Sequence, residues 1–110
     1  MQIDVMLGMR ARRDAQVVAG DDWSVQLMTY DAPDGDPVAP AGNLRLVIFK
    51  GRHDASGIDG VGVSPVVFDI PASKTRLKSG RWGWRIEQTV GDLRTTLMLG
   101  TLSIINPGKI

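Results

Sequence analysis

The chain has 110 residues, of which 43% are hydrophobic and 23% charged, and its formal net charge is +1. A chain of this length fits one domain and buries roughly two-thirds of the surface that its unfolded form exposes. It contains no cysteine and one histidine, which excludes disulfides, thiolate metal sites, a cysteine nucleophile and a site built from several histidines. The small net charge argues against nucleic acid as the main partner, because phosphate binding is usually driven by a clear basic excess.

No membrane partner is expected, since no apolar run approaches the roughly 20 residues that a spanning helix needs. Residues 1–19 carry Asp4, Arg10, Arg12, Arg13 and Asp14, where a signal peptide would need an apolar stretch. We therefore expect a protein that is not secreted.

Charge is divided unevenly along the chain. Residues 1–60 hold 6 Lys/Arg and 9 Asp, a net charge of −3, whereas residues 61–110 hold 7 Lys/Arg and 3 Asp/Glu, a net charge of +4. Complementary potentials orient association, so this division favours head-to-tail contacts between copies. The alternative interpretation is two solvated faces that differ by chance, because exposed charge pairs are individually weak.

Residues 1–14 are predicted to form an N-terminal arm or an edge strand, ahead of one β domain over residues 15–110. Gln2–Leu7 alternates polar and apolar side chains and Gly8 follows, which suits a short strand. Terminal segments are poorly ordered unless they dock on something. The segment therefore either adds an edge strand or reaches a neighbouring subunit.

Further strands are predicted where polar and apolar residues alternate or where branched and aromatic residues gather. These segments are residues 15–18, 22–30, 44–50, 66–70, 81–87, 93–99 and 101–105. In the 81–87 segment, Trp82, Trp84 and Ile86 share one face, and the Gly91-Asp92 pair after it predicts a tight type II′ hairpin turn. One helical turn with Ser73 as its cap is predicted within residues 72–78.

Two segments are predicted to be loops. Residues 31–42 contain three prolines and Asp31, Asp34 and Asp36, but Gly stands where a calcium loop would need its twelfth-position Glu, so we assign the aspartates to turns. Residues 51–64 hold four glycines and predict a mobile loop or a loose hairpin. The His53-Asp54 pair within them lacks the orienting group and closed pocket that acid–base catalysis requires.

About six to eight short strands with irregular turns predict an all-β fold, an Ig-like antiparallel β-sandwich. We expect its two sheets to enclose a core made of Trp23, Val25, Leu27, Leu44, Leu46, Ile48, Phe68, Ile70, Trp82, Trp84, Ile86, Leu93, Leu97, Leu102 and Ile104. Exposed tryptophans on a β face can stack on sugars or bases. The core interpretation of Trp82 and Trp84 is favoured because Ile86 continues their face.

The candidate functional residues are basic, and the chemistry we expect of them is protein contact. No Gly-rich phosphate loop opens a helix and no G-x-S-x-G motif is present, so we predict no catalytic residues, no cofactor, no metal and no small-molecule substrate. The possible protein-contact residues are Arg10, Arg12, Arg13, Lys74, Arg76, Lys78, Arg81 and Arg85.

Several short motifs follow one another in a fixed order over residues 15–105. They are Gly20-Asp21-Asp22-Trp23, Asp34-Gly35-Asp36-Pro37, Leu44 to Phe49, Ile70 to Trp84, Gly91-Asp92, Thr96-Leu97 and Gly100-Thr101-Leu102. This order resembles a family of small Ig-like modules found in bacteriophage structural proteins, from which Asp22 departs as an extra residue before the aromatic.

The resemblance implies a non-enzymatic virion component, such as a baseplate, tail, neck, fibre-attachment or capsid-decoration module. Its partners would be other virion proteins and copies of itself, and it would be made in the host cytoplasm and located in the virion. A receptor-binding or carbohydrate-binding β-sandwich is the alternative, motivated by the tryptophans and long loops. A small enzyme using His53 and Asp54 is a third and weaker hypothesis.

Overall fold

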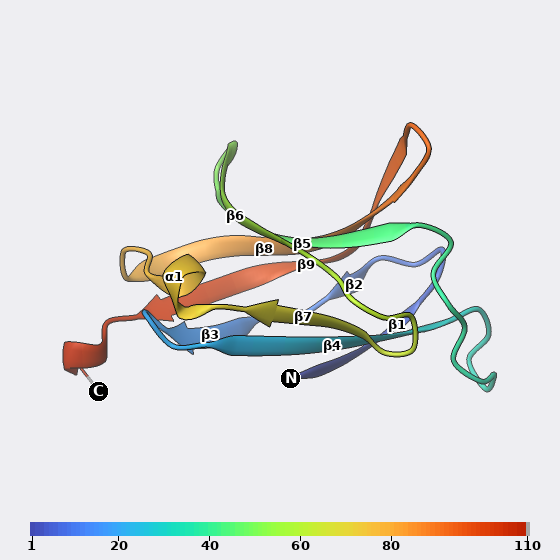
Figure 1. The fold of residues 1–110 in the computed structure, drawn as a ribbon, viewed down its shortest axis with the longest axis horizontal. Helices are drawn as coiled ribbons and strands as arrows, with labels where there is room; N and C mark the ends of the chain where they lie inside the picture. Colours follow the sequence, from blue (N-terminus) through green and yellow to red (C-terminus); the bar gives the residue numbers. More distant parts are fainter. Residues whose placement is uncertain (110) are drawn as a thin grey trace.

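The computed structural model describes residues 1–109 and is almost entirely β (Figure 1). Its elements in chain order are β1 (Gln2–Met6), β2 (Ala11–Arg12), β3 (Ala15–Val18), β4 (Trp23–Tyr30), β5 (Asn43–Lys50), β6 (His53–Asp59), β7 (Val66–Ile70), α1 (Ala72–Thr75), β8 (Gly80–Val90), β9 (Leu93–Ile105) and the 3₁₀ turn η1 (Pro107–Lys109). None of the helices in this described part is long and apolar enough to cross a membrane.

The strands form two layered sheets, which confirms the predicted all-β sandwich. The smaller sheet has the order β1-β4-β7, and the larger has β6-β5-β8-β9 with β2 and β3 both paired to β9. The pairs β1–β4, β2–β9 and β3–β9 are parallel, while the others are antiparallel. The sheets are therefore mixed, and the prediction of a wholly antiparallel sandwich is corrected, because β1, β2 and β3 each run in the same direction as their partner strand.

Residues 1–14 pack against both sheets in this structure. β1 is an edge strand of the smaller sheet, with Ile3 and Val5 buried beneath it. The chain then turns back and joins the larger sheet through β2, after which Arg13 donates from its backbone N–H to the Leu99 carbonyl at 3.2 Å. The N-terminal segment thus closes one side of the sandwich by contributing to both layers.

The core follows the predicted alternation along most strands. Trp84, Ile86 and Phe68 are fully buried, and the Trp84 ring lies 5.0 Å from the Trp23 ring between centroids. The prediction for Leu93 is wrong, because this residue is 68% exposed at the start of β9. The cause is a register shift between Ile86 and Glu87 in the β8–β9 pair, beyond which the hairpin extends past the two-layered core.

Residues 51–59 form the turn and the second strand of a hairpin with β5, within the segment that was predicted to be a mobile loop or a loose hairpin. β6 pairs antiparallel with β5 through a turn at Gly51, whose φ of 61° lies in the left-handed region. Side-chain alternation is weak in β6 because Ser56 and Gly57 stand in it, which explains why periodicity did not reveal the strand.

The single helical turn α1 is fixed by the β3–β4 turn and not by its own cap. Ser73 does not cap it; instead the backbone N–H of Ala72 donates to Asp22 Oδ1 at 2.7 Å. Thr75 is fully buried, and its hydroxyl accepts from the Gly20 backbone N–H at 3.1 Å and donates to the Asp21 carbonyl at 2.6 Å. The Gly-Asp-Asp-Trp motif therefore anchors α1 to the sandwich.

The sandwich measures 44 × 28 × 21 Å, and most of its turns lie toward the two ends of the long axis, whereas the β5–β6 and β8–β9 turns project from one side, each nearer a different end (Figure 1). We call one end the helical end, made of residues 19–22, 50–53 and 71–81. The opposite end, which we call the loop end, is made of residues 7–10, 31–42, 60–65 and 90–93. The registers Lys50↔His53 and Val90↔Leu93 mark these two ends in the larger sheet.

Candidate interaction surfaces

The predicted contact residues do not form one cluster. Arg12 lies in β2, and Arg10 and Arg13 flank that strand. Lys74, Arg76, Lys78 and Arg81 belong to the helical end, while Arg85 lies further along β8 on the outer face of the larger sheet. The structure therefore distributes the eight residues over three surfaces.

The arginines around β2 serve the N-terminal segment itself. Arg12 Nη2 lies 3.5 Å from Asp14 Oδ1, and both side chains are largely exposed. Arg13 Nη2 donates to the Gln2 carbonyl at 3.2 Å, which ties β1 to the segment after β2. Exposed pairs of this kind contribute roughly 0–1 kcal/mol, so these arginines give weak local support.

The helical end gains two cations that the sequence analysis did not select, Lys50 and Arg52. Lys50 Nζ lies 5.0 Å from the centroid of the Trp82 ring, a cation–π contact. Lys74 is held inside this end, because its Nζ donates to the Gly57 carbonyl at 2.8 Å. The β5–β6 hairpin places Lys50 over Trp82 and the middle of β6 against Lys74 of α1, and no local pattern in the sequence predicts that these segments meet.

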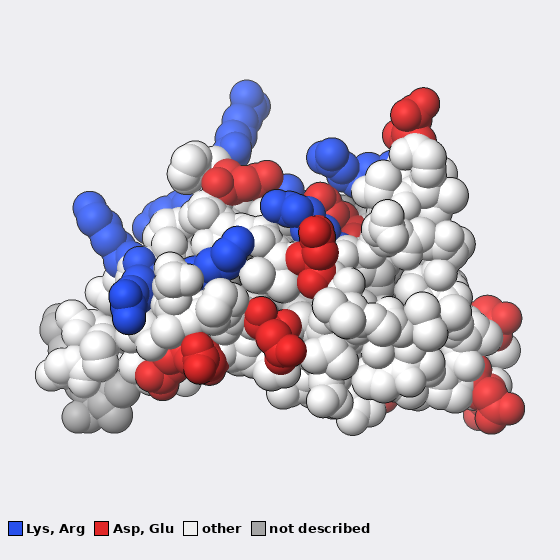
Figure 2. All heavy atoms as spheres, in the orientation of Figure 1, with Lys and Arg blue, Asp and Glu red and all other residues white. Residues whose placement is uncertain are grey.

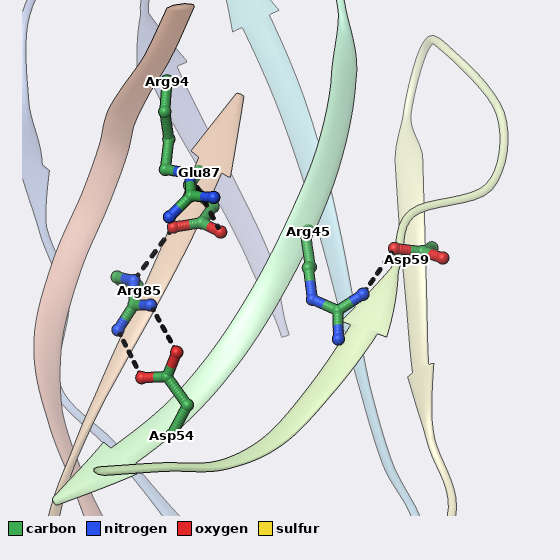
Figure 3. Close-up of polar contacts among 6 residues, drawn as sticks. All are labelled: Arg45, Asp54, Asp59, Arg85, Glu87 and Arg94. Atoms are coloured by element: carbon green, nitrogen blue, oxygen red, sulfur yellow. Dashed lines mark hydrogen bonds and ion pairs between the residues drawn. The ribbon is translucent and has the colours of Figure 1, made fainter. Parts of the chain in front are cut away.

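An ionic network covers the outer face of the larger sheet and centres on Arg85 (Figure 3). Arg85 donates from Nη1 and Nη2 to the two oxygens of Asp54 at 3.2 and 3.0 Å, and from Nε to Glu87 Oε2 at 3.0 Å. Arg94 Nε lies 4.0 Å from Glu87 Oε1. The bidentate pair is the strong geometry for a guanidinium and a carboxylate.

Burial within this network is uneven. The side chain of Glu87 is 9% exposed and that of Arg85 20%, whereas Asp54 is 58% and Arg94 69% exposed. A carboxylate this buried needs a partner, and Arg85 provides it. The hydrogen bond from Arg85 is the main cause that lowers the pKa of Asp54, and the same bond raises the pKa of Arg85.

Beside the network lies a polar hollow of about 520 Å³ between β5, β6 and the β8–β9 hairpin. Arg45 forms one wall, with its Nη1 3.1 Å from Asp59 Oδ1. Gly57 allows this placement, because a Cβ there would overlap the Arg45 guanidinium. The hollow is lined by Arg45, Val47, Asp54, Ala55, Ser56, Gly57, Glu87 and Arg94. A hollow with alternating charges suits a polar protein surface better than an apolar ligand.

The tryptophans are placed mainly as core residues. Trp84 is fully buried and donates from Nε1 to the Arg13 carbonyl at 2.8 Å. Trp82 and Trp23 are half-buried and pack against the core. Trp82 Nε1 donates to the Lys78 carbonyl at 2.9 Å, so its polar edge is already bonded within the chain.

The remaining candidates for chemistry lie apart or are already bonded. His53 is exposed on β6, and both carboxylate oxygens of the neighbouring Asp54 accept from Arg85. Asp31, Asp34 and Asp36 are exposed in the loop that follows β4. Within residues 1–109, no group of three or more His, Cys, Asp or Glu side chains gathers in a way that could hold a metal ion.

Comparison with known proteins shows a likeness among solved structures. No family model matches the chain, and no curated protein matches it. Among solved structures, the chain is similar to the N-terminal domain of phage TP901-1 ORF48, with a TM-score of 0.57 and 9% sequence identity over 94% of this chain and 95% of that chain. At this identity the likeness shows a shared fold.

Proposed function

We propose that this chain is a structural module of a bacteriophage particle that acts through protein contacts and carries out no catalytic step. The observation that carries the proposal is the fold likeness to the N-terminal domain of a phage protein over nearly the whole of both chains. The motif order from Gly20 to Leu102 supports it independently, because that order is a property of the sequence alone.

The strand order supports an Ig-like assignment of the sandwich. β4 and β7 lie side by side in one sheet, and β6-β5-β8-β9 run in order in the other. This matches strands B and E facing strands C′, C, F and G of a variable-type Ig sandwich. The parallel pairing of β1 with β4 is a departure.

The surface chemistry favours a module that docks on proteins. Arg85 is fixed by three hydrogen bonds to two carboxylates, so the charges of the outer face are held in place before any partner arrives. Preorganised charges give an interface its orientation and specificity more than its affinity. Baseplate, tail, neck and decoration positions all require contacts of this kind, and we propose the virion as the location of the protein.

The experiment is to delete the gene from the phage that encodes it and to purify particles from the wild type and the mutant. We expect the chain in wild-type particles at a fixed ratio to another virion protein, and we expect the mutant particles to be incomplete or unstable. Complete, infectious particles that never contained the chain would overturn the proposal. If the chain is essential but carries out no catalytic step, a copy carrying His53→Ala should restore complete particles to the deletion mutant. The same experiment tests the enzyme hypothesis.

A carbohydrate-binding role has one observation in its favour. A shallow hollow of about 400 Å³ beside Trp23 is lined by Asp22, Trp23, Ser24, Asp69, Ile70 and Pro71, and an aromatic next to carboxylates is a common sugar-binding combination. Titration with host cell-surface glycans should quench the fluorescence of the wild type and not of Trp23→Phe if this role is correct. The same fluorescence in the presence and absence of glycans would exclude it for the glycans used.

A further inference from the structure

The two ends of the molecule carry opposite net charges. The helical end holds six Lys/Arg against two Asp, a net charge of +4, and the cations are Lys50, Arg52, Lys74, Arg76, Lys78 and Arg81. The loop end holds four Asp against Arg10, a net charge of −3, and the acids are Asp31, Asp34, Asp36 and Asp92. Figure 2 shows most of the Lys and Arg of this face on the side of the helical end, with some acidic residues among them, and, of the charged residues, only acidic ones at the opposite end.

This separation is a product of the fold and differs from the division along the sequence. Lys50 and Arg52 belong to the acidic first half of the chain, but the β5–β6 hairpin brings them to the basic end. Asp92 belongs to the basic second half, but the β8–β9 turn places it at the acidic end. Within the described residues, no ion pair joins Asp31, Asp34, Asp36 or Asp92 to a cation of the same chain.

The loop end also exposes apolar side chains. The large hydrophobic residues that lie open to solvent are Met1, Met9, Val61, Val63, Val90 and Leu93, and all of them except Met1 lie in the turns of the loop end or at their strand boundaries. Leu93 is 68% and Val61 73% exposed. These residues stand in separate turns of the loop end and add apolar surface to it, which is an observation independent of the charges.

We propose that the loop end of one copy docks on the helical end of the next copy, so that the chain associates head to tail along its long axis. The charges of the two ends are complementary, and the half-buried Leu77 and Trp82 at the helical end offer apolar surface to the exposed residues of the loop end. Such a contact is heterologous, because different patches of the two copies meet, and it builds a ring or an open row. The inference rests on the charges and apolar residues of the two ends alone, and it does not depend on which particle the chain belongs to.

The contact is expected to be weak in isolation and to depend on salt. Exposed ion pairs contribute little individually, and the screening length falls from about 30 Å at 0.01 M salt to about 8 Å at 0.15 M. Self-association should therefore be visible at low ionic strength and high protein concentration, and it should be lost when salt is added.

Sedimentation velocity on the purified chain tests this inference. In about 10 mM salt we expect the weight-average sedimentation coefficient to rise with concentration, and in about 500 mM salt we expect it to stay at the monomer value. A coefficient that is independent of concentration at low salt would overturn the proposal. A rise that salt does not change would overturn it as well, since charge would not then hold the copies together.

Two charge-reversed variants make the test specific. The triple variant Asp31→Lys, Asp34→Lys, Asp36→Lys has two basic ends, and the triple variant Arg52→Glu, Arg76→Glu, Lys78→Glu has two acidic ends. We expect each variant alone to stay monomeric at low salt and an equimolar mixture to associate. A mixture that stays monomeric would contradict the head-to-tail contact.

The control variant adds the same number of lysines to the sides of the sandwich. It carries Gln2→Lys, Gln16→Lys and Gln26→Lys, all at exposed strand positions, and it should associate as the wild type does. Association by the Asp31, Asp34, Asp36 variant alone at the wild-type level would show that the loop end takes no part. All substituted side chains are exposed, so we expect every variant to keep the fold. Circular dichroism of each variant checks this.

Discussion

Gly100 on β9 should be among the least replaceable residues of the chain, because the segment after β2 crosses directly over it. A Cβ at this position would overlap the carbonyl oxygen of Arg13 and would stand 3.0 Å from Trp84 Nε1. The same carbonyl accepts the indole hydrogen bond of Trp84 at 2.8 Å. Gly100→Ala therefore forces the crossing segment away and breaks this bond.

The size of the effect follows from two costs. An indole N–H left unpaired in the core costs about 1–3 kcal/mol, and overpacking a tight contact costs about 1–3 kcal/mol more. Alanine returns roughly 0.5–1 kcal/mol, because it restricts the unfolded chain and suits a strand better than glycine. We expect Gly100→Ala to lower the free energy of unfolding by about 1–5 kcal/mol, a substantial share of the 5–15 kcal/mol typical of a domain.

Equilibrium urea unfolding, followed by tryptophan fluorescence, measures this loss. The midpoint should fall by about 1–3 M if the slope is that of a small domain. Gly35→Ala is the matched control, because its Cβ would meet Ala32 Cβ at an ordinary 3.4 Å, and it should change stability by less than about 0.5 kcal/mol. Equal midpoints for the two variants would refute the reasoning. Trp84→Phe in both backgrounds separates the lost hydrogen bond from the steric overlap.

Three further outcomes are expected from the ion pairs and hydrogen bonds described above. Arg85→Met should lower the free energy of unfolding at pH 7 by about 1–3 kcal/mol in urea titrations, because it leaves the nearly buried Glu87 without its guanidinium while Asp54 returns to solvent. Because Arg85 lowers the pKa of Asp54 below its ordinary 3.8, the Asp54 part of this difference should be fully present above about pH 4 and shrink as the pH falls through the lowered pKa; a difference that grows in acid would contradict the ion pair. Thr75→Val should cost about 1–3 kcal/mol in thermal unfolding, since it leaves the Gly20 N–H and the Asp21 carbonyl unpaired, whereas Ser73→Ala, at an exposed position, should change little.

Local pattern was enough to find most of the sandwich. The alternation in β4, β5, β7 and β8 placed Val25, Leu46, Phe68 and Trp84 on inward faces, and all four are buried. Alternation reports which face is covered by another layer, and in these strands both layers are regular. It says nothing about which strand lies beside which, so the parallel pairing of β1 with β4 was beyond it.

The sites where sequence reasoning failed share one physical cause, which is dependence on distant partners. Glu87 falls on a face that alternation assigns to solvent, yet it is nearly buried because Arg85 and Arg94 surround it after the register shift in β8. Lys50 and Arg52 join the basic end only because β6 folds back on β5. Charge clusters built by hairpins leave no signature in a single segment, and the anchoring of α1 by the Gly20 motif was missed for the same reason, since Ser73 was predicted as the cap.

The edges of the sheets decide which kinds of contact between copies remain open. On one side, Lys74 Nζ donates to the Gly57 carbonyl, Ser56 Oγ donates to the Lys74 carbonyl, and Val61 pairs with Val67, so strand addition to β6 would first have to displace α1. On the other side, β1 ends its sheet and pairs only with β4 among the described strands, which leaves strand addition there as the competing route to an assembly. The two routes differ in their response to salt, because salt screens the attraction between the charged ends, whereas main-chain hydrogen bonds along an added strand carry no net charge. Self-association that persists in strong salt would therefore count against the charged ends and favour uncharged contacts such as strand addition at β1, whereas association that salt abolishes is the result expected of the charged ends.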